Sequence, residues 1–199
     1  MKKILTPKLL LILAFSITVP GCARFLAAAS GPEPVGVPEG ERTLSQRVED
    51  MSIERTASIN LYKLNPEFAQ SRVLVMSFYS NVLLAGQVSN ESLKQMAGDY
   101  LKSLREVESV HNELIVAPVT LPYMTRAKDS IISARVRSAL TFAKGFPSSQ
   151  CKILVEDGVV YLMAKLDKDQ ADLAIRLIRD IPDVRKIVKL IDYLPDTRG

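Results

Sequence analysis

The chain has 199 residues, of which 47% are apolar and 24% are charged. Its formal charge of +4 comes from 26 Lys and Arg against 22 Asp and Glu, but three of the lysines lie among the first eight residues. Removing those lysines leaves 23 basic side chains, which excludes a protein that is strongly basic throughout. Residues 22–122 carry 9 basic and 12 acidic side chains, whereas residues 123–199 carry 14 and 10. Any attraction to anionic partners is therefore expected in the second half.

Residues 1–21 are predicted to be a lipoprotein signal peptide. A basic start precedes an apolar run of 11 residues at 9–19, shorter than the roughly 20 needed to span a bilayer but typical of an export signal. The run ends in Val19-Pro20-Gly21-Cys22, which is similar to a lipobox, so Cys22 is expected to be acylated. Ala23 follows, not the aspartate that retains enteric lipoproteins in the inner membrane, and this indicates the outer membrane. The alternative is cleavage at residues 27–29, which would leave a soluble periplasmic protein.

Residues 22–42 are predicted to form the lipid anchor and a linker rich in Pro and Gly. Two or more acyl chains anchor a protein stably, whereas one holds it only marginally. The only other cysteine is Cys151, so an acylated Cys22 leaves no intramolecular disulfide. Cys151 alternates with Ile153 and Val155 along a predicted strand, which indicates a buried, inert thiol.

Residues 43–117 are predicted to be a first domain. A helical pattern runs from Thr43 to the Asn65-Pro66 break, with an expected inner side of Val48, Met51, Ala57 and Leu61. A β-hairpin follows at 72–88, turning near Ser80-Asn81, then a helix at 89–105 and a strand at 107–116. Two prolines at 118–122 mark the domain boundary.

Residues 123–194 are predicted to be a second domain with the same order of elements. A helix at 127–143 has an expected inner side of Ile132, Val136, Ala139, Leu140 and Ala143. A hairpin at 151–166 turns at Asp157-Gly158, a strong type I′ signal because glycine accepts positive φ. A capping box at residues 167–170 opens the next helix, and residues 184–193 form the last strand.

The fold class is therefore α+β, with two tandem αββαβ units. Val82-Leu-Leu-Ala-Gly86 and Val160-Tyr-Leu-Met-Ala164 repeat each other 78 residues apart, which favours duplicated small domains over one large enzyme core. Each βαβ step predicts a right-handed parallel crossover, so each three-stranded sheet is mixed, with two helices on one face. The opposite sheet faces also carry apolar residues, such as Leu154, Tyr161 and Met163. We expect the other domain or the linker to cover them; the alternative is a partly solvated apolar face.

This pattern resembles the BON domain. The first unit offers Val82-Leu-Leu-Ala-Gly86 and Val107-Glu-Ser-Val110-His-Asn112. The second offers Asp129-x-x-Ile132-x-x-Arg135-Val136 within its first helix, Gly158-x-Val160 and Val184-x-x-Ile187. The family glycine is Ala164 in the second unit. Two such domains behind a lipobox are similar to the dual-BON outer-membrane lipoproteins. That resemblance implies a non-enzymatic protein that binds phospholipid through the first helix of its second domain.

The residues themselves contain no catalytic constellation. His111 is the only histidine, lies on a predicted strand, and is expected to pack or to form a hydrogen bond. A metal centre lacks His and Cys ligands, and no Gly-rich phosphate loop is present. We therefore predict no enzyme activity and no cofactor.

The candidate functional surface is the outer side of the helix at 127–143. Residues 126–144 include five basic side chains and one acidic one, Asp129, and apolar side chains lie among them. Such a face suits an anionic bilayer, because headgroups attract the cations while apolar side chains enter the acyl boundary. The predicted phospholipid-binding residues are Lys128, Ile131, Arg135, Arg137, Ser138, Phe142 and Lys144, with Phe146 following. The alternative is a solvated basic face with Ile131 and Phe142 packed on the other domain.

Together these features predict a lipid-anchored outer-membrane protein that faces the periplasm. It is expected to bind anionic phospholipid through its second domain and to support envelope integrity, for example at division sites. The competing hypothesis is an adaptor that binds an envelope or cell-division protein through exposed sheet faces, such as those of Leu154 and Met163. Nucleic acid is not an expected partner, because an exported protein rarely meets it.

Overall fold

The computed structural model describes residues 39–117 and 123–195. The predicted signal peptide, Cys22, most of the linker and the boundary at 118–122 lie outside the described residues. Within the described part of the chain, no helix is both long enough and apolar enough to cross a bilayer.

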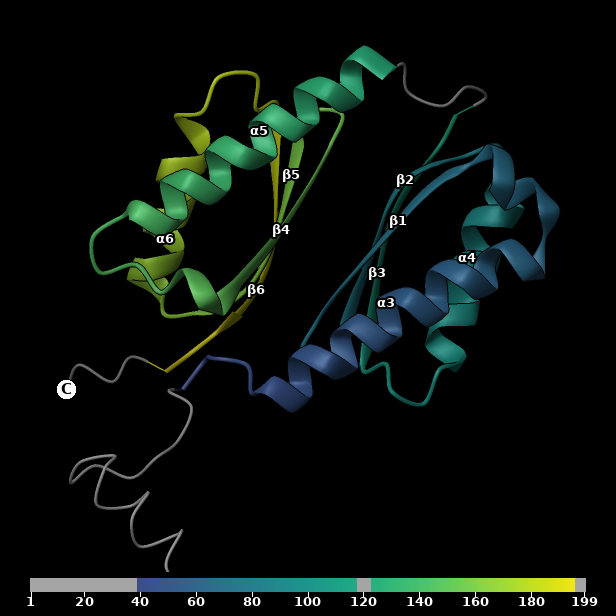
Figure 1. Cartoon of the computed structure of the whole chain (residues 1–199), viewed down its shortest axis with the longest axis horizontal. Coiled ribbons are helices and arrows are strands. Elements are labelled where there is room, and N and C mark those ends of the chain that lie inside the picture. The colour runs from purple at the N-terminus through teal and green to yellow at the C-terminus, as the bar shows by residue number, and fades with distance from the viewer. Residues whose placement is uncertain (1–38, 118–122, 196–199) are drawn as a thin grey trace, which may run out of the picture. The chain divides into compact units, whose positions relative to one another are not determined.

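The described elements form two αββαβ domains in tandem, which confirms the predicted fold class (Figure 1). The first domain consists of α3 (Leu44–Leu64), a 3₁₀ turn η1 (Pro66–Gln70), β1 (Arg72–Phe78), β2 (Asn81–Val88), α4 (Glu91–Ser103) and β3 (Ser109–Val116). The second domain consists of α5 (Tyr123–Phe142), η2 (Ser148–Gln150), β4 (Cys151–Glu156), β5 (Val159–Leu166), α6 (Lys168–Arg179) and β6 (Lys186–Tyr193).

Both sheets are mixed, as the connection lengths predict. β2 is the central strand of the first sheet, antiparallel to β1 and parallel to β3, and β5 has the same place between β4 and β6. Val82 pairs with Val110 and Val160 with Ile187, so the 78-residue sequence repeat is also a repeat of register. The predicted capping box of α6 is present, with Asp167 and Gln170 bonding each other's backbone N–H.

Gly86 has a backbone conformation that only glycine adopts readily, and its counterpart in the second domain, Ala164, does not share it. Its φ is +112°, and a Cβ at this position would lie 2.0 Å from the carbonyl oxygen of Arg72. Ala164 is not among the described residues with positive φ, so the second domain accommodates alanine where the family has glycine.

The rotation of α3 differs from the prediction. Ala57 and Leu61 are buried as expected, but Val48 and Met51 are 53% and 56% exposed. The buried face of α3 instead contains Asp50 and Ile53. Because α3 carries apolar residues on two sides, apolar periodicity does not decide which side faces the sheet.

Asp50 determines which side of α3 faces the sheet, because its carboxylate bonds the β1–β2 turn. Tyr79 and Ser80 have φ values of 52° and 60°, a conformation that is costly for residues other than glycine. Their backbone N–H groups donate to Asp50 at 3.2 and 3.0 Å, and the Ser77 hydroxyl donates at 2.7 Å. Arg42 Nη1 adds an ion pair at 2.7 Å and lies over the Phe78 ring. The buried carboxylate therefore compensates for a hairpin turn that has no glycine.

Asp129 of α5 plays the same part in the second domain. It is buried, and it accepts hydrogen bonds from the backbone N–H groups of Asp157 and Gly158, both at 2.8 Å. These two residues also have positive φ, at 48° and 68°. The repeat thus includes a buried aspartate in the first helix that bonds the hairpin turn.

The two sheets pack against each other through the faces that their helices leave open. One apolar core lies beneath α3 and α4, a second beneath α5 and α6, and a third between the sheets. The third contains Met76, Phe78, Leu83, Ala85, Tyr161 and Met163, all buried. This agrees with the expectation that the other domain covers the second sheet face, and both domains belong to one compact unit.

That packing reduces the sheet-face surface that the adaptor hypothesis used as its example. Met163 is only 2% exposed, and Leu154 is half-buried against the same core. A partner could reach Met163 only if the sheets separated, whereas Leu154 also lines a groove at the surface.

Polar contacts add to the sheet-to-sheet packing. Arg72 Nε of β1 lies 2.6 Å from Glu156 Oε1 of β4, and Lys152 Nζ lies 2.5 Å from Glu54 Oε1 of α3. The segment before α3 also bonds the second domain, since Gln150 donates to the Glu39 carbonyl oxygen at 2.8 Å. Ser149 donates to the Glu41 carboxylate at 2.6 Å.

Replacing Asp50 should destabilise the fold in a pH-dependent way. Burial alone raises the pKa of the Asp50 carboxyl, but hydrogen bonds from Arg42, Ser77 and Ser80 and the Arg42 charge outweigh it and hold that pKa below its usual value. A lowered folded-state pKa stabilises the fold above the unfolded value of about 4, and the contribution is lost as the pH falls through the folded pKa.

We expect Asp50→Asn to lower the free energy of unfolding by about 2–3 kcal/mol at pH 7, and the difference from the parent to shrink below about pH 4. Chemical denaturation across pH 2.5–7 measures this. Asp99→Asn is the control, because Asp99 is exposed on α4 and should change stability by less than about 0.5 kcal/mol. Equal effects of the two variants would contradict the assigned role of Asp50.

Truncating Met163 should destabilise the fold even though it lies in the core between the sheets and not in the core beneath α5 and α6. We expect Met163→Ala to cost about 2–5 kcal/mol, because it opens a cavity between the sheets. Met51→Ala is the matched control and should cost less than about 0.5 kcal/mol, because Met51 is exposed. Guanidinium denaturation compares the two, and a similar small cost would mean that the sheets do not share a core in solution.

Candidate functional site

Helix α5 presents one apolar face to the sheet and a different face to solvent. Ile132, Val136 and Leu140 are buried on the inner side of the helix, as predicted. Asp129 lies on the same side and bonds the hairpin turn. The helix starts at Tyr123, four residues before the predicted start. Its rotation is therefore fixed by both apolar packing and the carboxylate-to-turn bonds.

Five of the seven predicted site residues lie along one exposed side of α5. They recur at intervals of three or four residues, which places them on one side of a helix. This set, the α5 stripe, consists of Lys128, Ile131, Arg135, Ser138 and Phe142. Ile131 is 53% exposed and Phe142 is 84% exposed, so neither is buried against the other domain.

Arg137 and Lys144 do not belong to the α5 stripe. Two positions along a helix rotate a side chain by about 200°, so Arg137 points away from Arg135. It lines a groove of about 520 Å³ that also contains Arg126, Ser133 and Glu54. Lys144 is exposed but follows the end of α5, next to Gly145, whose φ is +72°.

Phe146 also differs from the prediction, because it is buried in the core beneath α5 and α6. The chain reverses at Gly145, which turns Phe146 inward. Phe142 is therefore the aromatic residue that this end of the helix exposes.

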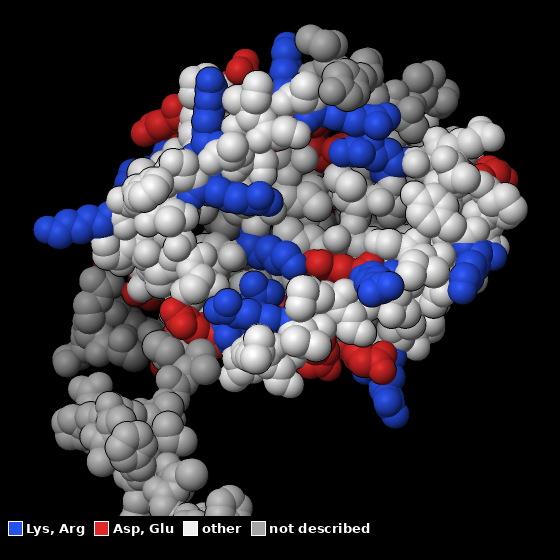
Figure 2. All heavy atoms as spheres, in the orientation of Figure 1, with Lys and Arg blue, Asp and Glu red and all other residues white. Residues whose placement is uncertain are grey.

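The surface around α5 is rich in cations. Among the charged side chains over the upper left of Figure 2, where α5 lies in Figure 1, more are Lys and Arg than Asp and Glu. Asp129, the one acidic residue of α5, is buried and bonded to the hairpin turn. Its negative charge is therefore directed away from the surface, and the α5 stripe combines two cations with exposed aliphatic and aromatic side chains.

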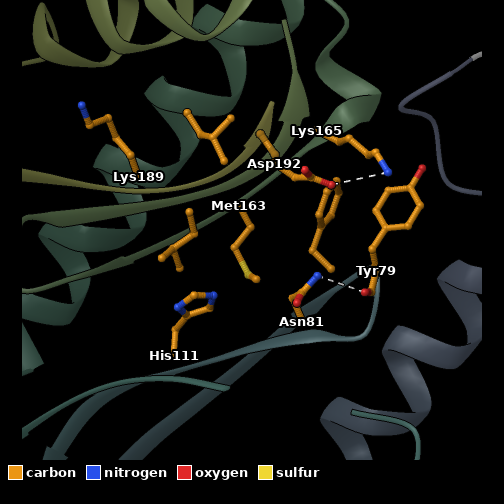
Figure 3. A pocket seen from close by; sticks show the side chains of 11 residues that line it. Tyr79, Asn81, His111, Met163, Lys165, Lys189 and Asp192 are labelled. Carbon is orange, nitrogen blue, oxygen red and sulfur yellow. Dashed lines mark hydrogen bonds and ion pairs between the residues drawn. The ribbon is translucent and has the colours of Figure 1, made fainter. Parts of the chain in front are cut away.

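His111 lies on β3, where it lines a pocket of about 440 Å³ between the two sheets (Figure 3). Tyr79, Met163, Lys165 and Lys189 lie around the same pocket. Lys165 pairs with Asp192 at 3.5 Å, and its Nζ lies 5.0 Å from the Tyr79 ring centroid. The described lining residues include no Ser, Thr or Cys, so Tyr79 carries the one side-chain hydroxyl among the residues that line this pocket.

Cys151 is half-buried against the core of the second domain. Burial raises the pKa of its thiol to about 12, so the thiolate is scarce at neutral pH. This environment fits the predicted packing role. Among residues 39–117 and 123–195, no group of three or more His, Cys, Asp or Glu side chains is placed to hold a metal ion.

The BON domain family model matches the chain twice, at residues 57–118 and 128–195. These ranges cover the greater part of both αββαβ units, and the second includes the α5 stripe.

Two curated relatives match most of the chain. The outer membrane lipoprotein DolP of Haemophilus influenzae is 29% identical over 195 residues, covering 94% of this chain and 96% of the relative. A 21 kDa hemolysin of Actinobacillus pleuropneumoniae is 27% identical over 157 residues, covering 79% and 80%.

Solved structures of CdsD, a structural protein of the type III secretion system of Chlamydia trachomatis, also align with the chain. The C-terminal domain covers 73% of this chain and 67% of its own at 18% identity, with a TM-score of 0.29. A second CdsD structure covers 75% and 66% at the same identity, with a TM-score of 0.30. Structural similarity at this level supports no conclusion about the function of this chain.

Proposed function

The chain belongs to the BON-domain family, and from this premise we propose that it is an outer-membrane lipoprotein whose α5 stripe binds anionic phospholipid. The proposal includes a periplasm-facing orientation and a role in envelope integrity, for example at division sites. The observation that carries it is the exposure of Ile131 and Phe142 on the same side of the helix as Lys128 and Arg135.

The chemistry of the α5 stripe matches a bilayer surface at two depths. Lys128 and Arg135 would each contribute about 1 kcal/mol near anionic headgroups. Ile131 and Phe142 would each contribute up to about 1.5–3 kcal/mol if they were fully buried in the acyl boundary. These sums are small for a free protein, since association also costs translational and rotational freedom. A tether removes much of that cost by raising the effective concentration of α5 at the membrane.

The proposed tether is the acylated Cys22, at the end of the predicted signal peptide. Support comes from the Haemophilus relative, which is named as an outer membrane lipoprotein and aligns with 94% of this chain. A permanent anchor with weak headgroup affinity would concentrate the protein where anionic lipid is enriched, because only the weak contact distinguishes one patch of membrane from another.

Substituting the α5 stripe should weaken lipid binding, and the structure supplies a matched control. We expect Arg135→Glu combined with Phe142→Ser to reduce binding to phosphatidylglycerol-containing liposomes about tenfold or more, because the pair loses one cation and one inserted side chain. Arg137→Glu combined with Thr141→Ser should have a much smaller effect, because Arg137 lines the groove on another side of α5. Co-sedimentation of the Cys22→Ser protein measures binding without the tether.

Purely zwitterionic liposomes should bind the parent weakly, and added salt should weaken binding to the anionic ones. Unchanged far-ultraviolet circular dichroism would show that the variants fold. If the Arg135/Phe142 variant sedimented as well as the parent, α5 would not be the lipid-binding surface.

Cys22→Ser should abolish lipid attachment. Cells grown with a labelled fatty acid are expected to label the parent protein and leave the Cys22→Ser protein unlabelled, and only the parent should fractionate with the outer membrane. An unlabelled parent in the soluble periplasmic fraction would instead support cleavage at residues 27–29.

A further inference from the structure

Helix α3 exposes an apolar stripe, interrupted once by a cation, on the side opposite its core. Its members recur at intervals of three, four or eight residues, with Arg55 at the intervening position. This set, the α3 stripe, consists of Leu44, Val48, Met51, Ile59 and Tyr62. Each side chain is between 45% and 78% exposed, whereas Ile53, Ala57 and Leu61 are buried on the inner side. A row of this kind, rimmed by polar residues, is typical of an interaction surface.

The electrostatic rim of the α3 stripe is positive. Arg55 lies within the row, and Arg47 and Lys63 are exposed on the same helix. Asp50 is buried on the hairpin turn, and Glu54 accepts from Lys152 and from the Ser77 backbone N–H. The third acidic residue of the helix, Glu49, is exposed but lies about 120° around the helix from the stripe. A complementary partner therefore carries negative charge beside its apolar side chains.

A second copy of the chain does not meet this requirement. Arg55 lies close to the middle of the stripe, so pairing two α3 stripes around a two-fold axis would bring Arg55 against Arg55. The five apolar members supply no carboxylate to compensate, and like charges facing each other oppose association.

The membrane proposed to bind α5 cannot also cover the α3 stripe, because the two helices lie on opposite sides of the paired sheets. The sheets pack face to face, so their helices cover the two outer faces, with α3 in one helix layer and α5 in the other (Figure 1). A flat membrane in contact with the α5 stripe therefore lies on the opposite side of the sheets from the α3 layer.

We propose that the α3 stripe binds an amphipathic helix of a partner protein, one whose apolar row is flanked by Asp or Glu. Two helices pack through rows of side chains spaced three or four residues apart, which is the spacing of the stripe. Carboxylates beside the partner's row would pair with Arg47, Arg55 and Lys63. This interaction goes beyond the proposed lipid contact and depends on neither α5 nor Cys22.

The test uses two synthetic 21-residue amphipathic peptides with the same Leu row, one flanked by Glu and its twin flanked by Lys. Fluorescence anisotropy with the full-length Cys22→Ser protein should show the Glu peptide binding about tenfold or more tightly than the Lys peptide. Arg55→Glu should abolish or reverse this preference, and Met51→Glu should weaken the Glu peptide about tenfold. Arg179→Glu, an equal charge change on the exposed side of α6, should leave both affinities unchanged.

Several results would overturn the proposal. They are equal affinity for the two peptides, no binding of either, or a preference that survives Arg55→Glu. Concentration-dependent dimerisation of the parent that Met51→Glu removes would assign the stripe to a second copy instead. Loss of phosphatidylglycerol liposome binding on Met51→Glu would assign it to lipid. The Arg135/Phe142 variant should retain the peptide preference, so failure of the α5 proposal and failure of this one are distinguishable.

Discussion

One interaction fixes how each domain is assembled: a buried carboxylate in the first helix bonds the backbone of the hairpin turn. Asp50 and Asp129 each accept two N–H groups from turn residues with positive φ, so helix and hairpin cannot rotate independently. In the first domain this bond turns one apolar side of α3 inward and leaves the other outside. In the second it removes the only acidic side chain of α5 from the exposed surface. The chemistry of both outer helix faces therefore follows from a structural contact on the inner side.

The sheet-to-sheet packing then restricts where a partner can bind. Small αββαβ units leave one sheet face uncovered, and here Met76, Phe78, Tyr161 and Met163 close those faces against each other. Ion pairs such as Arg72–Glu156 add polar contacts at the edge of this core. With the sheets occupied, the exposed apolar side chains of α3 and α5 remain available. The two domains share a fold but expose different helix surfaces, which is how duplication can add a second specificity without a second scaffold.

Local signals in the sequence predicted local structure well. Asp157-Gly158 and the capping box at Asp167 determine a turn and a helix start through contacts within a few residues, and both are confirmed. The side of α3 that faces inward was not predictable from apolar spacing, because the bonds that decide it join Asp50 to residues 27–30 positions away. The α5 stripe was predictable from helical spacing within one element. Arg137 lines a groove beside the α5 stripe, and contacts with residues of other elements such as Glu54, which helical spacing does not show, define that groove.

The contacts of residues 39–41 have a mechanical consequence. The chain first bonds the second domain, through Glu39 to Gln150 and Glu41 to Ser149, and only then enters α3 of the first. From Cys22 to Glu39 a fully extended chain reaches about 60 Å. A pulling force applied through the proposed Cys22 anchor would therefore load the contacts of Glu39 and Glu41 with the second domain before it reached α3. The segment that leads from the proposed anchor is therefore fixed first to the second domain, whichever surface the first domain offers to a partner.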